Sequence, residues 1–169
     1  IAERVVTVNG VSKAYAMTGW RIGYAAGDAD LIAQMRKIQG QSPSNPCSIS
    51  QAAAEIALTD SQHCVTEMCR AFRERHDWLV PALNELPGIR CEGGEGAFYV
   101  FADCAGAIEM LGLDGDPAFC EFLLEEAGVA LVPGSAFGTP NHARFSFACG
   151  LRTLREAIGR IGSALNRAG

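Results

Sequence analysis

The chain has 169 residues, of which 49% are hydrophobic and 20% are charged, and its formal net charge at pH 7 is −5. This composition is typical of a packed globular protein and excludes a disordered one. The negative charge and the lack of a Lys/Arg cluster disfavour nucleic acid as a partner. No apolar run approaches the roughly 18 residues of a membrane span, so we expect no membrane partner either.

The seven cysteines are odd in number, scattered in spacing and without a C-x-x-C pair, which does not fit a disulfide framework or structural zinc. The three histidines show no metal-ligand spacing, so we expect no metal site. The chain does not start with a basic segment followed by an apolar one, as a secretory signal would. We therefore predict a cytoplasmic protein whose reduced cysteines pack as small core residues.

Two short strands are predicted near the start of the chain, over residues 4–8 and 23–27. The segment between them, GVSKAYAMTGWRI, is then a connection between strands. A helix should begin after Asp28, which is a good N-cap residue, and end at Gly40. One face of this helix carries Leu31, Ile32, Met35 and Ile38.

The strongest periodic pattern lies in the middle of the chain. It follows a predicted loop at residues 41–46 and a short Ala-rich helix at residues 50–58. Apolar residues then recur at intervals of three and four, which predicts one long helix able to bridge two domains. The stripe consists of Val65, Met68, Cys69, Phe72, His76, Leu79 and Leu83.

The last part of the chain mixes strands and helices. Residues 97–102, 129–132 and 143–148 are rich in Phe, Val and Tyr and predict strands. Asp116, followed by a proline, predicts a helix that it caps, and Gly128 predicts the end of that helix. A final helix carries Leu151, Leu154, Ile158, Ile161 and Leu165 along one side. This order of elements favours an α/β architecture.

Lys13 is the first candidate for chemistry. An amine becomes a useful nucleophile near neutral pH only where its charge is disfavoured, and the neighbours of Lys13 include no carboxylate. Arg21 follows eight residues later, and its planar fork of donors suits a phosphate, to which Ser12 and Thr18 could add hydroxyl donors. The alternatives are a solvated loop lysine and an ordinary salt bridge, and we expect Trp20 to pack in the core.

Arg144 is the second candidate. Side chains alternate across a strand, so Arg144 and Ser146 share one face and two phenylalanines share the other. An arginine on such a strand needs an anion, and a bidentate carboxylate is the natural one. An internal ion pair is the alternative. Phe98 and Tyr99 are expected to be packing residues.

The segment GVSKAYAMTGWRIG resembles the lysine motif of class I and II aminotransferases, the aspartate-aminotransferase-like, fold type I enzymes that use pyridoxal 5′-phosphate (PLP). Its order is most similar to the bacterial branch of broad aspartate and aromatic aminotransferases. Further resemblances follow along the chain, at residues 44–53, 96–99, 132–138 and 143–148.

The resemblance implies a role for each candidate. Lys13 would form the covalent link to the cofactor aldehyde and move the proton, and Arg21 would bind the cofactor phosphate, with Ser12 beside it. Arg144 would grip the α-carboxylate of the substrate. Relatives often carry a phosphate-binding serine where this chain has Gly10.

The resemblance also implies the organisation of the chain. Residues 1–74 would be the C-terminal portion of the large PLP-binding domain. Residues 75–169 would be a small C-terminal α/β domain with a mainly antiparallel sheet, reached through a long interdomain helix. The family's upstream parts have no counterpart here, so we expect a piece of a longer enzyme, inactive alone and homodimeric when full-length.

The implied activity is that of a transaminase, which moves an amino group between an L-amino acid and a 2-oxo acid. A PLP-dependent carbon–sulfur β-lyase on the same fold is one alternative, and an aminotransferase-like sensor domain of a transcription regulator is another. Related dicarboxylate enzymes carry an arginine where this chain has Gly40, so the usual partner of a distal substrate carboxylate is missing.

Overall fold

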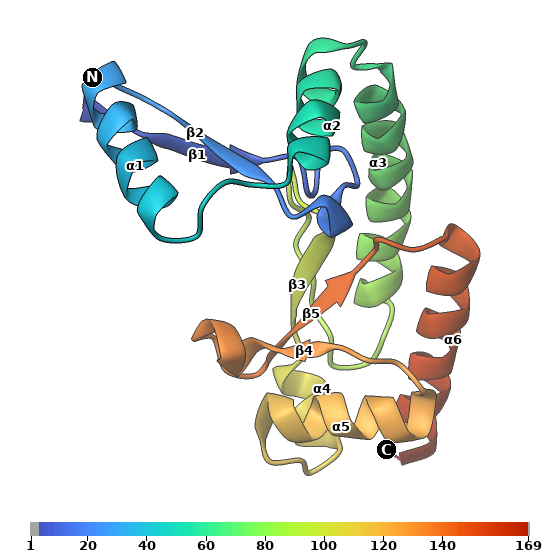
Figure 1. Ribbon diagram of the computed structural model, residues 1–169. Helices are drawn as coiled ribbons and strands as arrows, with labels where there is room; N and C mark the ends of the chain where they lie inside the picture. Colours follow the sequence, from blue (N-terminus) through green and yellow to red (C-terminus); the bar gives the residue numbers. More distant parts are fainter. Residues whose placement is uncertain (1–3, 169) are drawn as a thin grey trace. The chain divides into compact units, whose positions relative to one another are not determined.

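The computed structural model describes residues 4–168 and divides into two compact units, Ile1–Met68 and Cys69–Gly169 (Figure 1). The division falls inside helix α3 (His63–Asn84), the long helix expected from the sequence. The domain boundary expected between residues 74 and 75 lies in the same helix and stays a prediction. The mixed α/β class and the antiparallel sheets agree with the sequence analysis.

Two antiparallel strands form the sheet of the first unit. Strand β1 (Thr7–Gly10) pairs with β2 (Gly23–Ala26) from Thr7 opposite Ala26 to Gly10 opposite Gly23. The strand expected at residues 4–8 therefore starts and ends later, because pairing with β2 extends it through two residues that favour turns. The short helix η2 (Thr18–Trp20) lies in the connection between the strands.

Helix α1 (Ala29–Gln41) begins as expected. The side chain of Asp28 accepts hydrogen bonds from the backbone N–H groups of Asp30 and Leu31, at 3.0 and 3.2 Å. Its apolar face is largely exposed, with Ile38 70% accessible. Helix α2 (Ser48–Thr59) follows the loop and contributes the buried Ala54.

Most of the first unit's apolar surface is uncovered. Trp20, expected in the core, is 43% exposed, because a two-stranded sheet with two helices offers too little surface to bury it. The other large apolar residues exposed in this unit are Val5, Val8, Tyr24, Leu31, Met35, Ile38, Ile49, Ile56 and Leu58.

A three-stranded antiparallel sheet organises the second unit, in the order β3 (Tyr99–Asp103), β5 (His142–Ser146), β4 (Val132–Pro133). Each expected strand is present. The strand predicted at residues 129–132 overlaps β4 only at Val132, since only Val132 and Pro133 pair with β5, opposite Arg144 and Ala143.

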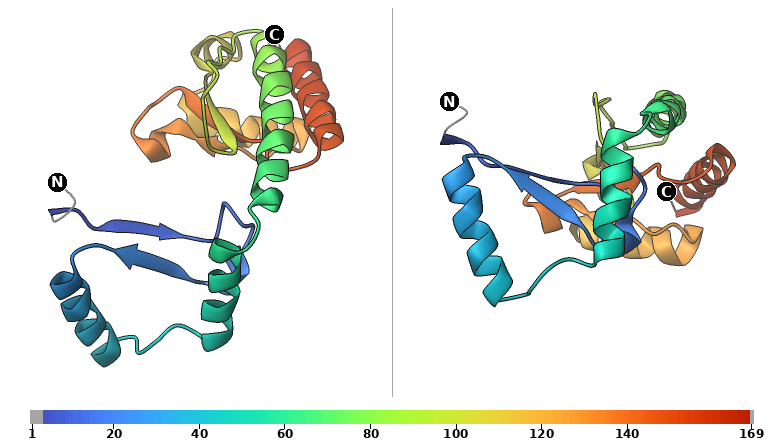
Figure 2. Two further views of the ribbon diagram at one scale, coloured as in Figure 1. Left: turned by 90° about the horizontal axis from the view of Figure 1, so that it is seen from above. Right: turned by 45° about the horizontal axis from the view of Figure 1, so that its top comes forward.

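Helices cover one face of this sheet. Helix α4 (Ala105–Met110) was not expected from the sequence, whereas α5 (Gly115–Ala127) and α6 (Leu151–Ala168) were. Helix α6 runs beside α3 (Figure 2), and the guanidinium carbon of Arg155 lies 5.7 Å from the ring centre of Trp78. Gly128 ends α5 in a left-handed conformation, as predicted.

 Helix α6 packs its apolar stripe inward, and Leu154, Ile161 and Leu165 are buried as predicted.

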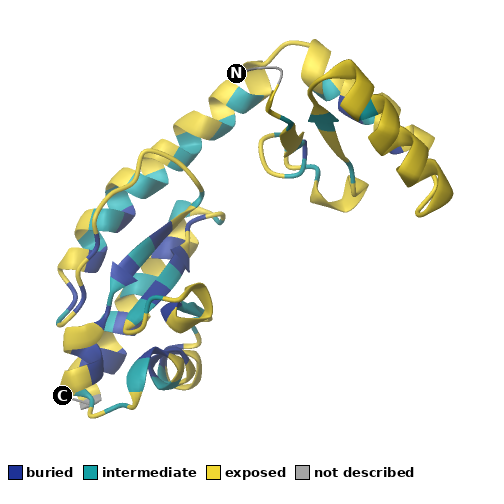
Figure 3. Ribbon diagram, turned by 90° about the vertical axis from the view of Figure 1, so that its left-hand side faces the viewer, coloured by how far each residue is buried: buried dark blue, intermediate teal, exposed yellow. Residues whose placement is uncertain are grey.

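The core of the described residues lies almost entirely in the second unit (Figure 3). This core includes Leu79 and Leu83 of α3 together with Phe119 and Leu123 of α5. On the sheet, Val100, Ala102, Ala143 and Phe145 turn toward the helices. The alternate residues of β3 and β5 therefore occupy the opposite, open face, and Arg144 is one of them.

Asp116 corrects one expectation. It lies in the first turn of α5, one residue after the helix begins at Gly115, and its side chain is only 2% exposed. Its carboxylate accepts hydrogen bonds from the backbone N–H groups of Ser135 and Asn141, so it is not the predicted helix cap. Sequence pattern alone identified the helix but not the use of this side chain.

The cysteines correct another. Cys91, Cys104 and Cys120 are buried as small core residues, as predicted, whereas Cys47, Cys64 and Cys69 are exposed, so the prediction is wrong for those three. All seven are free thiols. Burial raises the pKa of the Cys104 thiol to about 12 and those of Cys91 and Cys120 to about 11.

Candidate active site

Lys13 lies in the connection between β1 and β2, within a series of tight turns. The backbone N–H groups of Tyr15, Ala16 and Met17 donate to the carbonyl oxygens of Val11, Lys13 and Ser12, at 3.1–3.2 Å. Val11 is buried and anchors the segment, and Lys13 is exposed. The turns thus present the lysine side chain at the surface of the first unit.

Arg21 follows η2 and has an unusual backbone. Its φ and ψ are both 49°, which is the left-handed region that side chains other than glycine seldom adopt. The guanidinium donates a hydrogen bond to the carbonyl oxygen of Thr18 at 2.8 Å. This bond uses one of the five N–H donors of the side chain and fixes the direction of the fork.

Ser12, Lys13 and Arg21, the three cofactor residues expected from the sequence, line one open cavity of about 550 Å³. The paired glycines Gly10 and Gly23 form part of its wall. The cavity lies within the usual size range of small-molecule sites. Within the described part of the chain, no carboxylate lines it.

This donor set fits PLP. An amine suits the cofactor aldehyde, and a guanidinium with a neighbouring hydroxyl suits its phosphate. A carboxylate on the wall would repel the phosphate, and none of the described residues on the wall carries one. Gly10 lines the cavity without offering a hydroxyl, so Ser12 is the hydroxyl donor among the described residues that line it.

Arg144 lies in the second unit, on the open face of the sheet. Its guanidinium carbon is 5.2 Å from the ring centre of Tyr99 and 5.0 Å from that of Phe137. Both distances are within the range of cation–π attraction. Across residues 4–168 no carboxylate forms a salt bridge with Arg144, so the internal ion pair considered above is not found.

The surroundings of Arg144 were not predicted from the sequence. Tyr99 was assigned to packing, yet it is 39% exposed and borders the guanidinium. Phe137, on the short helix η3 (Gly134–Phe137), is 51% exposed and borders it from another element. In the sequence, the only signal for Phe137 was its place between two glycines, Gly134 and Gly138.

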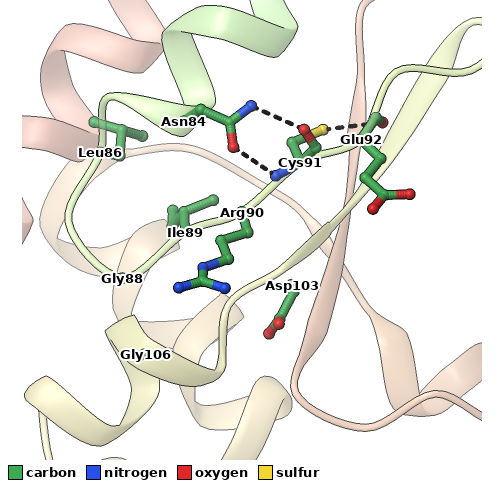
Figure 4. A pocket seen from close by; sticks show the side chains of 9 residues that line it. All are labelled: Asn84, Leu86, Gly88, Ile89, Arg90, Cys91, Glu92, Asp103 and Gly106. Atoms are coloured by element: carbon green, nitrogen blue, oxygen red, sulfur yellow. Dashed lines mark hydrogen bonds between the residues drawn. The ribbon is translucent and has the colours of Figure 1, made fainter.

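A second open cavity, in the second unit, is lined by none of the expected site residues. It has a volume of about 750 Å³, and Figure 4 shows Arg90 among its lining side chains together with the carboxylates of Glu92 and Asp103. Asn84 spans its edge through two hydrogen bonds to the backbone of Cys91. One arginine among two carboxylates is a poor phosphate site, so this cavity does not compete with the one at Lys13.

In the part of the chain that the structure describes, no group of three or more His, Cys, Asp or Glu side chains is placed to hold a metal ion. None of the helices within residues 4–168 combines the length and apolar character needed to cross a membrane.

Comparison with known proteins identifies relatives over the whole chain. Residues 2–161 match the family model described as aminotransferase class I and II. The chain is 53% identical to an aspartate/prephenate aminotransferase of Nitrosomonas europaea, with 98% of this chain and 43% of the relative aligned. It is 48% identical to an aspartate aminotransferase of Rhizobium meliloti, over 99% of this chain and 42% of the relative.

Solved structures agree. The crystal structure of the aspartate aminotransferase from Rhizobium meliloti superposes with a TM-score of 0.91 at 47% identity, over 99% of this chain and 43% of that one. An aromatic aminotransferase from Pyrococcus horikoshii superposes with a TM-score of 0.87 at 38% identity, over 98% of this chain and 44% of that one. The chain thus spans less than half the length of the relatives it matches.

Proposed function

Because the chain belongs to the class I and II aminotransferase family, we propose that it supplies the lysine and the carboxylate-binding arginine of a PLP-dependent transaminase. The reaction would move an amino group between an L-amino acid and a 2-oxo acid. The observation that carries this proposal is the single cavity lined by Ser12, Lys13 and Arg21, with no carboxylate on its wall in the described residues.

Arg21 and Ser12 would hold the phosphate of the cofactor. The guanidinium fork offers paired N–H donors to phosphate oxygens, and the Ser12 hydroxyl adds a third direction. The Thr18 carbonyl keeps the fork oriented before the phosphate arrives, so less conformational entropy is lost on binding. When bound, PLP supplies the reactive aldehyde and a ring that accepts electrons.

Lys13 would make the covalent attachment and move the proton. Its side chain is the one amine among the described residues that line the cavity. An amine tethered at this position would be placed to take a proton from one carbon and return it to another nearby. The backbone hydrogen bonds of residues 11–17 hold the base of this side chain at the cavity wall.

Arg144 would bind the α-carboxylate of the amino acid. The aromatic rings of Tyr99 and Phe137 attract the cation without offering it a carboxylate, so its charge is available to a substrate. A two-point grip would also fix the orientation of the substrate.

The names of the relatives support aspartate-type and aromatic-type substrates for the longer protein. Those relatives are named as aspartate/prephenate, aspartate and aromatic aminotransferases. We further propose that the full-length protein is a homodimer and is located in the cytoplasm. The 169 residues alone are expected to be inactive. No observation favours the lyase or the regulator over transamination.

Borohydride reduction tests the attachment site. We expect PLP, incubated with the 169-residue chain and then reduced, to become fixed on Lys13, where peptide mapping will find it. The sequence has only one other lysine, Lys37, which makes it a natural control. Lys13→Arg should abolish most of the labelling, whereas Lys37→Arg should leave it intact. Equal labelling of both lysines, or preferential labelling of Lys37, would refute the proposal.

A further inference from the structure

Asp116 is the only acidic side chain that is buried among residues 4–168. Its Oδ2 accepts a hydrogen bond from the backbone N–H of Ser135 at 2.8 Å, and its Oδ1 accepts one from the N–H of Asn141 at 2.9 Å. Burying a carboxylate is costly unless such donors compensate it. One side chain therefore joins both ends of the segment at residues 135–141 to helix α5.

The segment between these two anchors is tightly closed. The backbone N–H of Thr139 donates to the carbonyl oxygen of Gly134 at 3.1 Å. The backbone N–H of Gly138 donates to the carbonyl oxygen of Ser135 at 3.0 Å. A side chain at Gly134 would collide with Thr139 and His142. The backbone path of this loop is thus set by its closure and by the two bonds to Asp116.

Phe137 is carried on this loop and borders Arg144. Its ring centre lies 5.0 Å from the guanidinium carbon and 6.1 Å from the ring centre of Phe101. Half of the Phe137 side chain is exposed, so the core does not hold it. Its position against Arg144 must come from the backbone that carries it.

We propose that Asp116 is a positioning residue for substrate binding. Through the N–H groups of Ser135 and Asn141 it holds the Phe137 ring against Arg144, and the ring in turn holds the guanidinium where it meets a carboxylate. This inference rests on the proposed role of Arg144. It adds a residue of α5 that touches neither substrate nor cofactor.

The ring current of Phe137 reports this position directly. In the NMR spectrum of the 169-residue chain, the Arg144 side-chain protons should be displaced by the two neighbouring rings. Phe137→Leu should remove one part of that displacement, and Asp116→Ala should remove the same part. Asp114→Asn is the matched control, because Asp114 is an exposed carboxylate at the start of the same helix and makes no side-chain cap. It should leave the Arg144 signals unchanged.

Titration with L-aspartate measures the consequence for binding. We expect Asp116→Ala to weaken binding at Arg144 about fivefold, the size of a partly desolvated cation–π contact. The double variant Asp116→Ala/Phe137→Leu should be no weaker than Phe137→Leu, since the two residues act through one contact. Where Asp116→Ala unfolds the unit, Asp116→Asn keeps the volume and one acceptor oxygen and serves in the same comparison.

The outcomes separate this inference from the proposed function. Unchanged Arg144 ring-current displacements in the folded Asp116 variants would overturn the positioning role, as would fully additive losses in the double variant. If wild-type Arg144 does not respond to L-aspartate at all, the substrate-binding role proposed for it fails. The ring-current comparison still decides in that case whether Asp116 positions Phe137.

Discussion

Arg21 gives the sharpest prediction because its strained backbone lowers the stability of the fold, whereas its side chain is proposed to raise the affinity for PLP. With φ and ψ at 49°, a residue other than glycine is strained by about 1–2 kcal/mol. Replacing Arg21 by glycine should relieve this strain, whereas replacing it by alanine should not. We therefore expect Arg21→Gly to have a free energy of unfolding about 1 kcal/mol above that of Arg21→Ala.

The effect of both variants on the cofactor should be the same. Each removes the guanidinium, and charge-assisted hydrogen bonds contribute about 1.5–3 kcal/mol apiece. Two such bonds to the phosphate correspond to a loss of about 10²- to 10⁴-fold in PLP affinity. Pyridoxal, which has the aldehyde but no phosphate, should bind wild type and both variants alike.

The assay compares the two ligands on one protein. Absorbance titrations of the 169-residue chain give the affinity for PLP and for pyridoxal, and their ratio isolates the contribution of the phosphate. Denaturant unfolding of the same samples gives the stability difference between the glycine and alanine variants. A PLP-to-pyridoxal ratio that survives Arg21→Gly would show that Arg21 does not hold the phosphate.

Three further predictions concern the fold. The N–H donors of Ser135 and Asn141 outweigh the effect of burial and lower the pKa of Asp116 below its ordinary 3.8, so its stabilising contribution is present above about pH 4 and is lost as the pH falls through the lowered folded-state pKa. Urea unfolding should accordingly show the difference between wild type and Asp116→Asn shrinking toward pH 3; a constant difference would contradict this. At pH 8, iodoacetamide should modify Cys47, whose pKa is lowered by backbone N–H groups of Ser50 and Ile49, well before Cys104, whose pKa is raised to about 12 by burial; equal rates in mass spectra would refute it. Gly88→Ala should prevent stable folding of the second unit, because Gly88 has φ 74° and its Cα faces the backbone of Gly106 and Ala107. The variant should lack a cooperative thermal unfolding transition, and a melting curve like that of the wild type would contradict this.

Much of the fold could be predicted because the local rules agree with the packing. The stripe on α6 predicted which side is buried, and Leu154 and Leu165 are indeed buried. The cap at Asp28 and the stop at Gly128 were equally local, since each depends on one side chain or one backbone conformation. The lysine motif was predictable for a different reason: its residues are close in sequence, so one turn brings Lys13 and Arg21 to one cavity.

What sequence patterns missed depends on contacts between distant residues. Asp116 has the pattern of a helix cap, and only the fold shows that its partners are 19 and 25 residues away. Phe137 and Tyr99 meet Arg144 because a loop and a neighbouring strand converge, which no local spacing predicts. The predicted burial of Trp20 was wrong in the opposite direction, because hydrophobicity predicts burial only where enough surface exists to cover the side chain.

The aromatic surroundings of Arg144 have a consequence for how an anion can reach it. An arginine held by an internal carboxylate must exchange one counter-ion for another, and the tethered rival competes at high effective concentration. Among the described residues, the faces of Tyr99 and Phe137 attract positive charge but offer the N–H groups of Arg144 no lone pair, so we expect an arriving carboxylate to displace only water. In the role that we propose for Arg144, such a receptor would accept a carboxylate without first having to rearrange.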